Sequence, residues 1–388
     1  MKTFRQSPVD PGFVQDPYPA YEKARALGDI VFWEEYGMPV ATTHAAVDRL
    51  LRDPRFGRER PNDRRVAPQA HLAAFHAVED LSLLELEGER HARLRGLVLR
   101  AFTSRRIAGM EAEIAALAGD LIDGFPDDPF DLLPAFARPL PAIVIARLLG
   151  VPDAAAPRLL DWSNAMVAMY QARRGREVEQ AASDAAAEFS AYLAGVIEGR
   201  RASPGDDLIS ELIAARDGTG RLSQEEMIAT CILLLNAGHE ATVHTIGNAV
   251  LALHAEGSPP VTDAVIEEVL RFDPPLHLFT RWAYEESEIA GVQIPRGTQV
   301  GLLLASAGRD AQRFPAPDRF DPDRAANRHL AFGGGRHFCL GAPLARLELR
   351  VALGMLRDRL PRLKIVEVPR FAGIYHFHGL ERLIVRAG

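Results

Sequence analysis

Cysteine is scarce in this chain, because only Cys231 and Cys339 occur among its 388 residues. Two cysteines cannot form a disulfide framework, so we expect a protein of the reducing cytoplasm. Positive charge is not in excess either, since the formal net charge is −7. Proteins that bind nucleic acids normally carry a basic face, and we therefore expect no nucleic-acid partner.

Patterns of membrane targeting and of linkers are missing as well. Residues 1–19 are polar and rich in proline and glycine, which predicts neither a signal peptide nor a membrane anchor. The apolar stretch Met227–Gly238 is shorter than the roughly 20 residues that span a bilayer. No linker-like composition, charge block or internal repeat interrupts the chain. We therefore predict a single domain over 1–388 and expect a monomer.

The periodicity of apolar residues predicts a mainly α fold with small β-sheets (α+β). Residues 30–43 alternate around Glu35–Gly37 and predict a hairpin, and 289–304 predict a second strand–turn–strand, broken at 295–297. Elsewhere the spacing is helical, and one predicted helix presents an apolar face made of Leu94, Leu97, Val98 and Ala101.

One predicted helix is much longer than the others. Ser223 and Glu226 form a capping box, and the apolar run that follows continues to about residue 257. At about 1.5 Å per residue this helix is about 50 Å long, and it must lie in the core. Inside it, Glu240 is ionisable and Ala237 and Gly238 are small. Taken alone, this pattern favours a close helix crossing at Gly238 with Glu240 in a satisfied pair, although a flat ligand packed on the helix needs the same residues.

The two cysteines lie in different surroundings. Cys231 stands in the apolar run of the long helix and is predicted to be an inert core residue. Cys339 follows three glycines and precedes an amphipathic helix over about 342–360, which Pro361 ends. The glycines permit a tight loop, and the start of the helix favours a thiolate.

Other roles for Cys339 have less support. A zinc site needs more cysteines or histidines nearby than His329 and His337, and a phosphate-binding loop needs a Lys-Ser/Thr pair that is absent. A catalytic cysteine with a histidine base stays open at this point.

The Cys339 segment resembles the haem-binding loop of the cytochrome P450 family, in its soluble bacterial type. The family pattern Phe-x-x-Gly-x-x-x-Cys-x-Gly falls on Phe332, Gly335, Cys339 and Gly341. Further family motifs occur in the right order, and similarity runs from residue 16 to the end of the chain. These motifs are His91 with Arg95, the oxygen-activation stretch Ala237–Glu240, the Glu-x-x-Arg pair Glu268 with Arg271, and Pro317–Phe320.

The resemblance implies a haem b (iron protoporphyrin IX) buried between the long helix and the helix after Cys339, with Cys339 as the metal ligand. It implies that the propionates contact His91, Arg95, Arg281 and His337, and that further haem contacts come from Ala237, Phe332, Gly333, Arg336 and Gly341. Glu268, Arg271 and Arg319 are expected to be structural and to hold the Cys339 loop, with Arg324 as the alternative to Arg319.

The implied activity is that of a monooxygenase that uses O2 and electrons from outside the chain. A ferredoxin or flavodoxin with its NAD(P)H reductase is the implied donor, since no flavin or iron–sulfur motif is found. Two interpretations are equally supported for a set of four arginines: they form a basic patch that docks the electron donor, or they are ordinary solvated surface charges. These are Arg93, Arg100, Arg105 and Arg346.

The chain departs from the family at one catalytic position. Most members have a threonine directly after the acid of the oxygen-activation stretch, whereas Glu240 is followed by Ala241 and only then by Thr242. A helical step is about 100°, so we expect Thr242 to point away from the direction of Ala241. Proton delivery then depends on Glu240 through water, on a substrate hydroxyl, or on peroxide as the oxidant. A peroxygenase driven by H2O2 is therefore an alternative function, and a non-catalytic haem sensor or carrier is a weaker one.

The resemblance also places the substrate pocket. Its walls are mostly apolar, with His277 and His376 as polar groups, and suit a small to medium lipophilic substrate. Hydroxylation, epoxidation and O-dealkylation all remain open as reactions. The expected wall residues are Leu83, Met166, Met169, Leu234, Ala237, Ala241, His277, Phe279, Tyr375 and Phe377.

Overall fold

The computed structural model describes residues 1–65, 67, 69–170, 174–216, 220–325, 327–375 and 377–388. These residues form two compact units. Unit 1 comprises Met1–Arg64, Ala118–Ala137 and Ala241–Gly388, and unit 2 comprises Arg65–Leu117 and Arg138–Glu240. Each unit is assembled from separated stretches of the chain, and the single domain stays a prediction.

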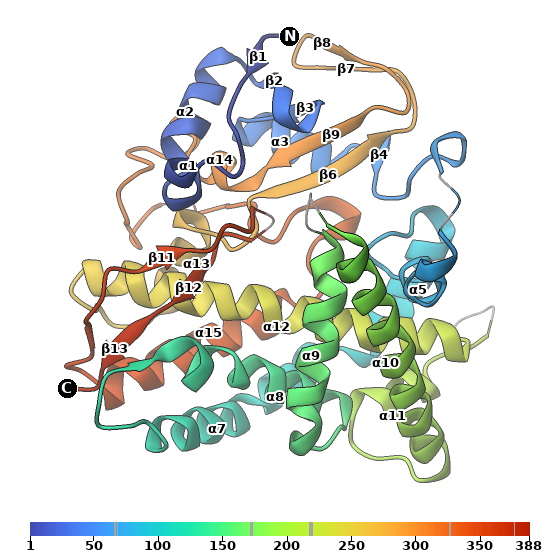
Figure 1. Cartoon of the computed structure of the whole chain (residues 1–388), viewed down its shortest axis with the longest axis vertical. Coiled ribbons are helices and arrows are strands. Elements are labelled where there is room, and N and C mark those ends of the chain that lie inside the picture. Colours follow the sequence, from blue (N-terminus) through green and yellow to red (C-terminus); the bar gives the residue numbers. More distant parts are fainter. Residues whose placement is uncertain (66, 68, 171–173, 217–219, 326, 376) are drawn as a thin grey trace. The chain divides into compact units, whose positions relative to one another are not determined.

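Unit 2 is built from helices (Figure 1). Its helix α10 (Arg176–Ala202) packs against α9 (Ala156–Val167) and α4 (Ala73–Glu79). In α5 (Gly88–Ala101), the four residues of the predicted apolar face are all buried, which confirms that prediction. The other helices are α6 (Ser104–Gly109), α8 (Pro139–Leu149) and α11 (Leu208–Ala214), with 3₁₀ turns at Ala70–Leu72, Asp153–Ala155 and Ala168–Tyr170; α7 (Glu111–Asp123) and α12 (Gln224–Ala255) continue into unit 1.

Unit 1 contains the β-sheets. The largest has six strands in the order β1 (Thr3–Phe4), β2 (Ile30–Trp33), β3 (Met38–Ala41), β9 (Gln299–Leu303), β6 (Leu278–Ala283) and β4 (Phe56–Gly57). The smaller sheets join β10 (Lys364–Ile365), β13 (Ile384–Arg386) and β5 (Phe130–Asp131), then β11 (Arg370–Phe371) and β12 (Leu380–Arg382), and finally β7 (Ser287–Ile289) and β8 (Val292–Ile294).

The helices of unit 1 lie before, between and after these strands along the chain. They are α1 (Pro11–Gln15), α2 (Tyr18–Leu27), α3 (His44–Arg52), α13 (Asp263–Phe272), α14 (Leu304–Gly308) and α15 (Ala342–Arg359), with short turns at Glu34–Tyr36, Asn62–Arg64, Leu133–Ala137 and Gly335–His337. The helix predicted after Cys339 is therefore confirmed as α15. The mainly helical fold with small sheets is confirmed too.

The predicted hairpin over 30–43 is present. Strands β2 and β3 pair antiparallel from Ile30 with Ala41 to Trp33 with Met38, and Gly37 turns the chain with a φ of 61°. The second predicted strand–turn–strand is also present, but its strands enter different sheets: β8 pairs with β7, and β9 pairs with β3 and β6.

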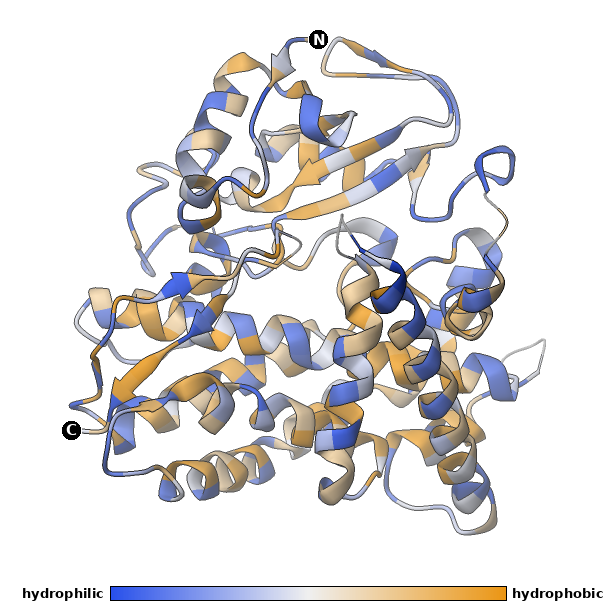
Figure 2. Ribbon diagram, viewed as in Figure 1, coloured by the Kyte–Doolittle hydropathy of each residue, from blue (hydrophilic) through white to orange (hydrophobic). Residues whose placement is uncertain are grey.

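Alternating residues of the large sheet enter two hydrophobic clusters. Ile30 and Ala41 belong to a cluster with residues of α3, whereas Val31 and Val40 belong to one with residues of α1 and α2. Side chains of successive strand residues point to opposite faces, so helices cover both faces of this sheet. Along the helices, hydrophobic and hydrophilic residues alternate (Figure 2).

The long predicted helix is α12, with 32 residues. Its capping box is formed as expected: the backbone N–H of Ser223 donates to the Glu226 carboxylate at 2.9 Å, and the N–H of Glu226 donates to the Ser223 hydroxyl at 3.1 Å. None of the helices in the described ranges is both long and apolar enough to cross a bilayer.

Candidate functional site

Cys339 lies between a short turn, Gly335–His337, and helix α15, whose N-cap is Gly341. Its backbone N–H donates to the carbonyl of Phe332 at 3.0 Å and so closes the loop. The Cys339 side chain is partly exposed. The positive end of the helix dipole at the start of α15 favours a thiolate there.

Two glycines fix the shape of this loop. Gly333 and Gly335 have φ angles of +69° and +66°. A Cβ on Gly335 would lie 2.3 Å from the carbonyl oxygen of Leu51 in α3, and one on Gly333 would lie 3.3 Å from the ring of Phe279 in β6. Only glycine combines these angles with such a close approach, so the loop is held against α3 and β6.

A positive charge lies close to the thiol. Arg346 in α15 donates to Glu267 at 2.5 Å, and its guanidinium lies 4.6 Å from the centroid of the Phe332 ring. The hydrogen bond with Glu267 raises the pKa of Arg346, and the charge of Cys339 adds to this effect. Burial would raise the pKa of Glu267, but hydrogen bonds with Arg346 and His329 hold it at about 2. Arg346 therefore stays a cation beside the loop.

Cys231 has the opposite surroundings. It is fully buried in α12, and burial raises the pKa of its thiol to about 12. Such a thiol stays protonated and behaves as an apolar side chain. Of the two cysteines, Cys339 alone combines partial exposure with a position ahead of a helix N-terminus.

One face of α12 is open although the helix belongs to the core. Ala237 is exposed, and Leu234, Ala241 and His244 are partly exposed, at spacings of three, four and three residues that place them on one stripe. Small and apolar residues on an open stripe suit a flat ligand packed against the helix. Within unit 1, Ala241 on this stripe and the thiol of the Cys339 loop are residues of the kind that suits a haem with a thiolate ligand.

The neighbouring face of α12 bears out the close helix crossing. A Cβ on Gly238 would lie 3.4 Å from the side chain of Ile145 in α8. The Glu240 carboxylate lies 3.2 Å from the Nε2 atom of His239, and about a fifth of its side chain is exposed. The crossing at Gly238 and the open stripe at Ala237 are thus separate features of one helix.

Thr242 is buried and its hydroxyl hydrogen-bonds to the carboxyl group of Glu348 in α15. Glu348 is 1% exposed, and burial raises the pKa of its carboxyl well above the ordinary value. Ala241, one step earlier, is partly exposed. Ala241 and Thr242 therefore have different surroundings, in agreement with the expectation that the helical step points them in different directions. None of the sequence motifs includes Glu348, although an acid between Leu347 and Leu349 on an amphipathic helix is a usable signal.

The residues expected to bind haem propionates lie in both units. In unit 2, His91 is buried and Arg95 is half-buried one turn later on α5. In unit 1, Arg281 of β6 is 2% exposed and His337 is half-buried, while Arg336, expected among the other haem contacts, is exposed. Their convergence on one cofactor stays a prediction.

The ion-pair network near the end of α13 corrects one assignment. Glu268 and Arg271 pair as expected, and both are fully buried. The second guanidinium on Glu268 is that of Arg324, at 3.1 Å, whereas Arg319 has an exposed side chain and contributes its backbone carbonyl to both arginines. The alternative, Arg324, therefore has the role first given to the Arg319 side chain, because the chain places only the backbone of Arg319 next to the pair.

Among the expected pocket residues, those of unit 2 are mostly buried. Leu83, Met166 and Met169 are at most 7% exposed, and the Met166 sulfur lies 3.9 Å from the side-chain nitrogen of Asn236. Leu234 and Ala237 lie on the open stripe of α12.

In unit 1, Tyr21 links two of the expected pocket residues, His277 and Tyr375. The Tyr21 hydroxyl lies 2.9 Å from the Nδ1 atom of His277 and 2.9 Å from the hydroxyl of Tyr375. Burial lowers the pKa of His277 to about 4. Phe377 is buried with its ring 5.2 Å from that of His244. His376 lies outside the described residues, and the pocket as a whole stays a prediction.

Comparison with known proteins supplies a family. The family model described as cytochrome P450 matches residues 258–359. Over 98% of its length the chain is 36% identical to "Cytochrome P450 107B1" of Saccharopolyspora erythraea, 97% of which is covered. It is 38% identical, over 91% of the chain and 88% of the relative, to "Vitamin D(3) 25-hydroxylase" of Pseudonocardia autotrophica. The crystal structure of P450BioI with an acyl carrier protein that bears hexadec-9Z-enoic acid superposes with a TM-score of 0.91 at 33% identity and covers 97% of this chain and 100% of that one.

Proposed function

This chain belongs to the cytochrome P450 monooxygenases, and on that premise we propose that it inserts one oxygen atom from O2 into a small to medium lipophilic substrate, with haem b bound through Cys339. The geometry of the Cys339 loop supports this proposal most directly. A partly exposed thiol ahead of a helix, on a loop that two left-handed glycines fix, would suit the thiolate that holds a haem iron.

The bound haem supplies the activation of dioxygen, which an electron-donating thiolate favours. The residues of the chain supply the surroundings. Cys339 would hold the iron, and Arg346 places a cation beside the loop. The open stripe of α12 offers an apolar surface for the cofactor and substrate, and a site of this kind excludes water from the reacting groups.

Proton delivery is assigned to Glu240. Its carboxylate is partly exposed and lies next to the open stripe, so it can exchange protons through water. Thr242 is less suited, because its hydroxyl is engaged by Glu348. Ala241 has no hydroxyl of its own, which leaves a substrate hydroxyl as a second source.

A lipophilic substrate agrees with the apolar wall residues and with the relatives. The name of one relative specifies vitamin D3, and one solved structure holds a fatty acyl chain on a carrier protein. Both are largely apolar ligands, and a pocket lined by methionine, leucine and phenylalanine suits this class.

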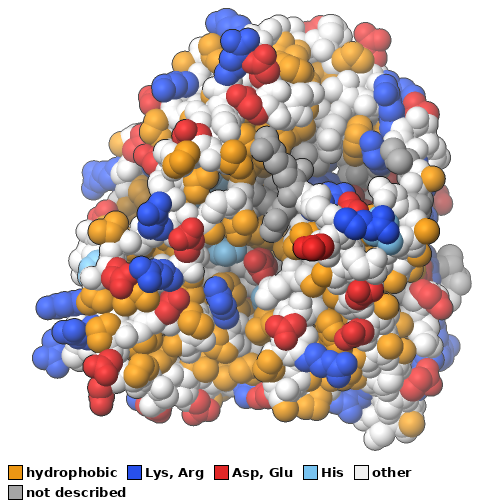
Figure 3. Space-filling model, in the orientation of Figure 1, with side chains coloured by type: hydrophobic (Ala, Val, Ile, Leu, Met, Phe, Trp, Pro, Cys, Tyr) orange, Lys and Arg blue, Asp and Glu red, His pale blue; other side chains and the backbone are white. Residues whose placement is uncertain are grey.

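We propose a ferredoxin or flavodoxin with an NAD(P)H reductase as the electron donor. The arginines considered for docking are not equivalent. Arg93 pairs with Glu226 at 2.8 Å and Arg346 pairs with Glu267, while Arg100 and Arg105 are exposed. On the face shown in Figure 3, basic and acidic side chains interleave. We therefore propose that Arg100 and Arg105, rather than the paired Arg93 and Arg346, contact the electron donor.

The peroxygenase alternative has one observation in its favour, the alanine at position 241. Turnover of a lipophilic substrate by the haem-loaded protein decides between the two. We expect product with a ferredoxin couple, NAD(P)H and O2, and far less with hydrogen peroxide alone. Equal or better turnover with peroxide alone would favour the peroxygenase, and no product under either condition would favour a haem carrier or sensor.

A further inference from the structure

Three potential metal ligands meet in unit 1 at the end of α13. Asp273 is the C-cap of that helix, His277 follows four residues later, and His378 comes from the C-terminal segment. The Asp273 carboxylate lies 2.9 Å from the Nδ1 atom of His378 and 3.7 Å from the Nε2 atom of His277. One ligand atom of each residue lies within 4.8 Å of the others.

Neighbouring side chains hold these ligands in place. The Tyr21 hydroxyl lies 2.9 Å from Nδ1 of His277, so the Nε2 atom of that ring is left on the side of Asp273. The Tyr18 hydroxyl donates to the Asp273 carboxylate at 2.6 Å. Phe371 stacks on His378 with ring centroids 3.8 Å apart. Partners that orient the imidazole and carboxylate ligands are typical of metal sites.

The cluster contains polar atoms without hydrogen-bond partners. His277 is 1% exposed and His378 is 8% exposed, and within the described ranges the Nε2 atom of each is buried without a partner. A buried polar atom of this kind costs about 1–3 kcal/mol. The Nε2 atom of His277 faces the Asp273 carboxylate at 3.7 Å, which is beyond hydrogen-bond distance. An additional ligand of the cluster would satisfy it.

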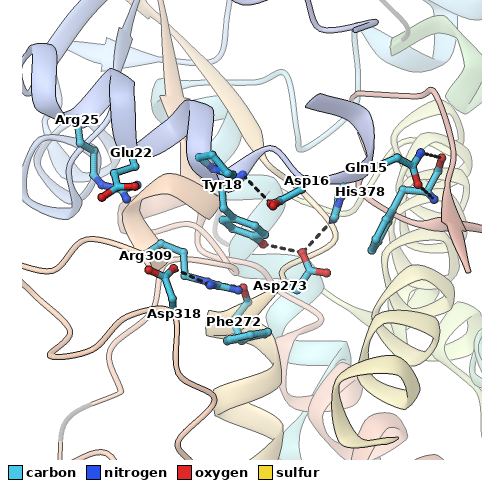
Figure 4. A pocket seen from close by; sticks show the side chains of 12 residues that line it. Gln15, Asp16, Tyr18, Glu22, Arg25, Phe272, Asp273, Arg309, Asp318 and His378 are labelled. Carbon is cyan, nitrogen blue, oxygen red and sulfur yellow. Dashed lines mark hydrogen bonds and ion pairs between the residues drawn. The ribbon is translucent and has the colours of Figure 1, made fainter. Parts of the chain in front are cut away.

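A cavity of about 380 Å³ adjoins the cluster (Figure 4). Asp273 and His378 line it together with Tyr18 and Phe371, and it is partly open. The cavity offers a cation a route from solvent and leaves room for a water molecule as a further ligand.

We propose that Asp273, His277 and His378 bind a divalent cation of the zinc class. Two imidazole nitrogens and one carboxylate oxygen are a donor set that zinc accepts, with a water in the fourth position. Zinc bonds of about 2.0–2.2 Å would draw the three ligands together by small side-chain rotations. The bound cation would tie the C-terminal segment to the end of α13. This site uses none of the residues assigned to the haem, and of its three ligands only His277 is also an expected wall residue of the substrate pocket.

The test is a zinc titration of haem-loaded protein that has been freed of metal with a chelator. We expect calorimetry to show one zinc ion per chain, bound at least about tenfold more weakly by His378→Ala and Asp273→Asn than by the unchanged protein. Tyr21→Phe removes the hydroxyl that positions His277 and should weaken binding by roughly tenfold. His254→Ala, which removes an exposed histidine of α12, is the matched control and should leave affinity unchanged.

X-ray absorption at the zinc edge keeps the test decisive if a variant fails to fold. The unchanged protein with one equivalent of zinc should show two imidazole nitrogens and a carboxylate oxygen as ligands, and the haem iron absorbs at a different edge. No binding of one equivalent, a spectrum without imidazole ligands, or equal affinity in folded His378→Ala and the unchanged protein would overturn the proposal and leave Asp273 and His378 as a structural ion pair.

Discussion

Arg271 donates two hydrogen bonds to Glu268, from Nε at 2.8 Å and from Nη2 at 2.7 Å, and both side chains are fully buried. Arg324, Asn327 and the backbone N–H of Asp321 also donate to this carboxylate. A buried pair that is surrounded in this way fixes the segment after α14 to α13. Removal of one member leaves an uncompensated charge in the interior.

Glu268→Ala should therefore destabilise the fold by about 3–5 kcal/mol and yield protein with little haem. Denaturant unfolding and the ratio of haem to protein measure the two effects. Glu256→Ala, which removes an exposed glutamate after α12, is the control and should behave like the unchanged chain. A Glu268→Ala protein with full haem content but altered products would contradict the structural role.

The Cys339 loop depends on Gly335 for a steric reason. Gly335→Ala would place a Cβ 2.3 Å from the Leu51 carbonyl at a φ of +66°, so the loop must move. We expect faster haem loss and a lower melting temperature. Gly354→Ala in α15 is the matched control: no atom lies within 4 Å of its Cβ, and an alanine there should stabilise the helix by up to about 1 kcal/mol. Equal haem retention in the two variants would show that the loop tolerates a shift.

Glu348 predicts a specific dependence of stability on pH. Because burial raises the pKa of its carboxyl well above the ordinary value, the folded protein holds a proton that the unfolded chain releases above about pH 4.3. This contribution to the free energy of unfolding is complete below that pH and is lost as pH rises toward the folded-state pKa.

Glu348→Gln keeps a neutral polar group and removes the titration. Urea unfolding at about pH 5 and about pH 8 should show that the variant loses less stability across this range than the unchanged protein. Glu381→Gln at an exposed position is the control, with the pH dependence of the unchanged chain. Identical pH dependence for Glu348→Gln would mean that the buried carboxyl is already ionised in the folded state.

Several of these elements could be predicted from local sequence. The capping box of Ser223 and Glu226, the hairpin around Gly37 and the helix after Cys339 all rest on interactions between residues close in the chain. Pairings between distant segments could not be predicted in this way. The partners of β8 and β9 and the choice of Arg324 over Arg319 depend on how separate segments pack.

The residues of the candidate site also differ in whether local sequence predicts them. The motif around Cys339 identifies the loop and its thiol, since the glycines and the helix lie within a few residues. The contact of Thr242 with Glu348 joins residues 106 positions apart, and no local pattern of either predicts the other. The cluster of Asp273, His277 and His378 likewise needs the C-terminal segment to return to α13.

Ala241 and Glu240 predict how reducing power is used. If Glu240 delivers protons and position 241 lacks a helpful hydroxyl, the unchanged protein should release much of its reducing power as peroxide on substrates without a hydroxyl group. Ala241→Thr should then raise the product formed per NAD(P)H consumed, and Glu240→Gln should slow turnover, since an amide cannot relay protons as an acid does.

The matching measurement compares coupling in Ala241→Thr and in the unchanged protein across substrates with and without a hydroxyl. Loss of activity in Ala241→Thr confined to one hydroxyl-bearing substrate would identify the substrate as the proton source. Equal coupling for every substrate would show that position 241 only makes room above the haem.

The identity of the iron ligand is tested most directly by the absorption spectrum of the reduced, carbon-monoxide-bound protein. The unchanged chain and Cys231→Ser should both show the red-shifted Soret band of a thiolate-bound haem, because Cys231 is buried with a pKa of about 12. Cys339→Ser should lose that band, since a hydroxyl does not replace the thiolate. A band that persists in Cys339→Ser, or that disappears in folded Cys231→Ser, would contradict the assignment of Cys339.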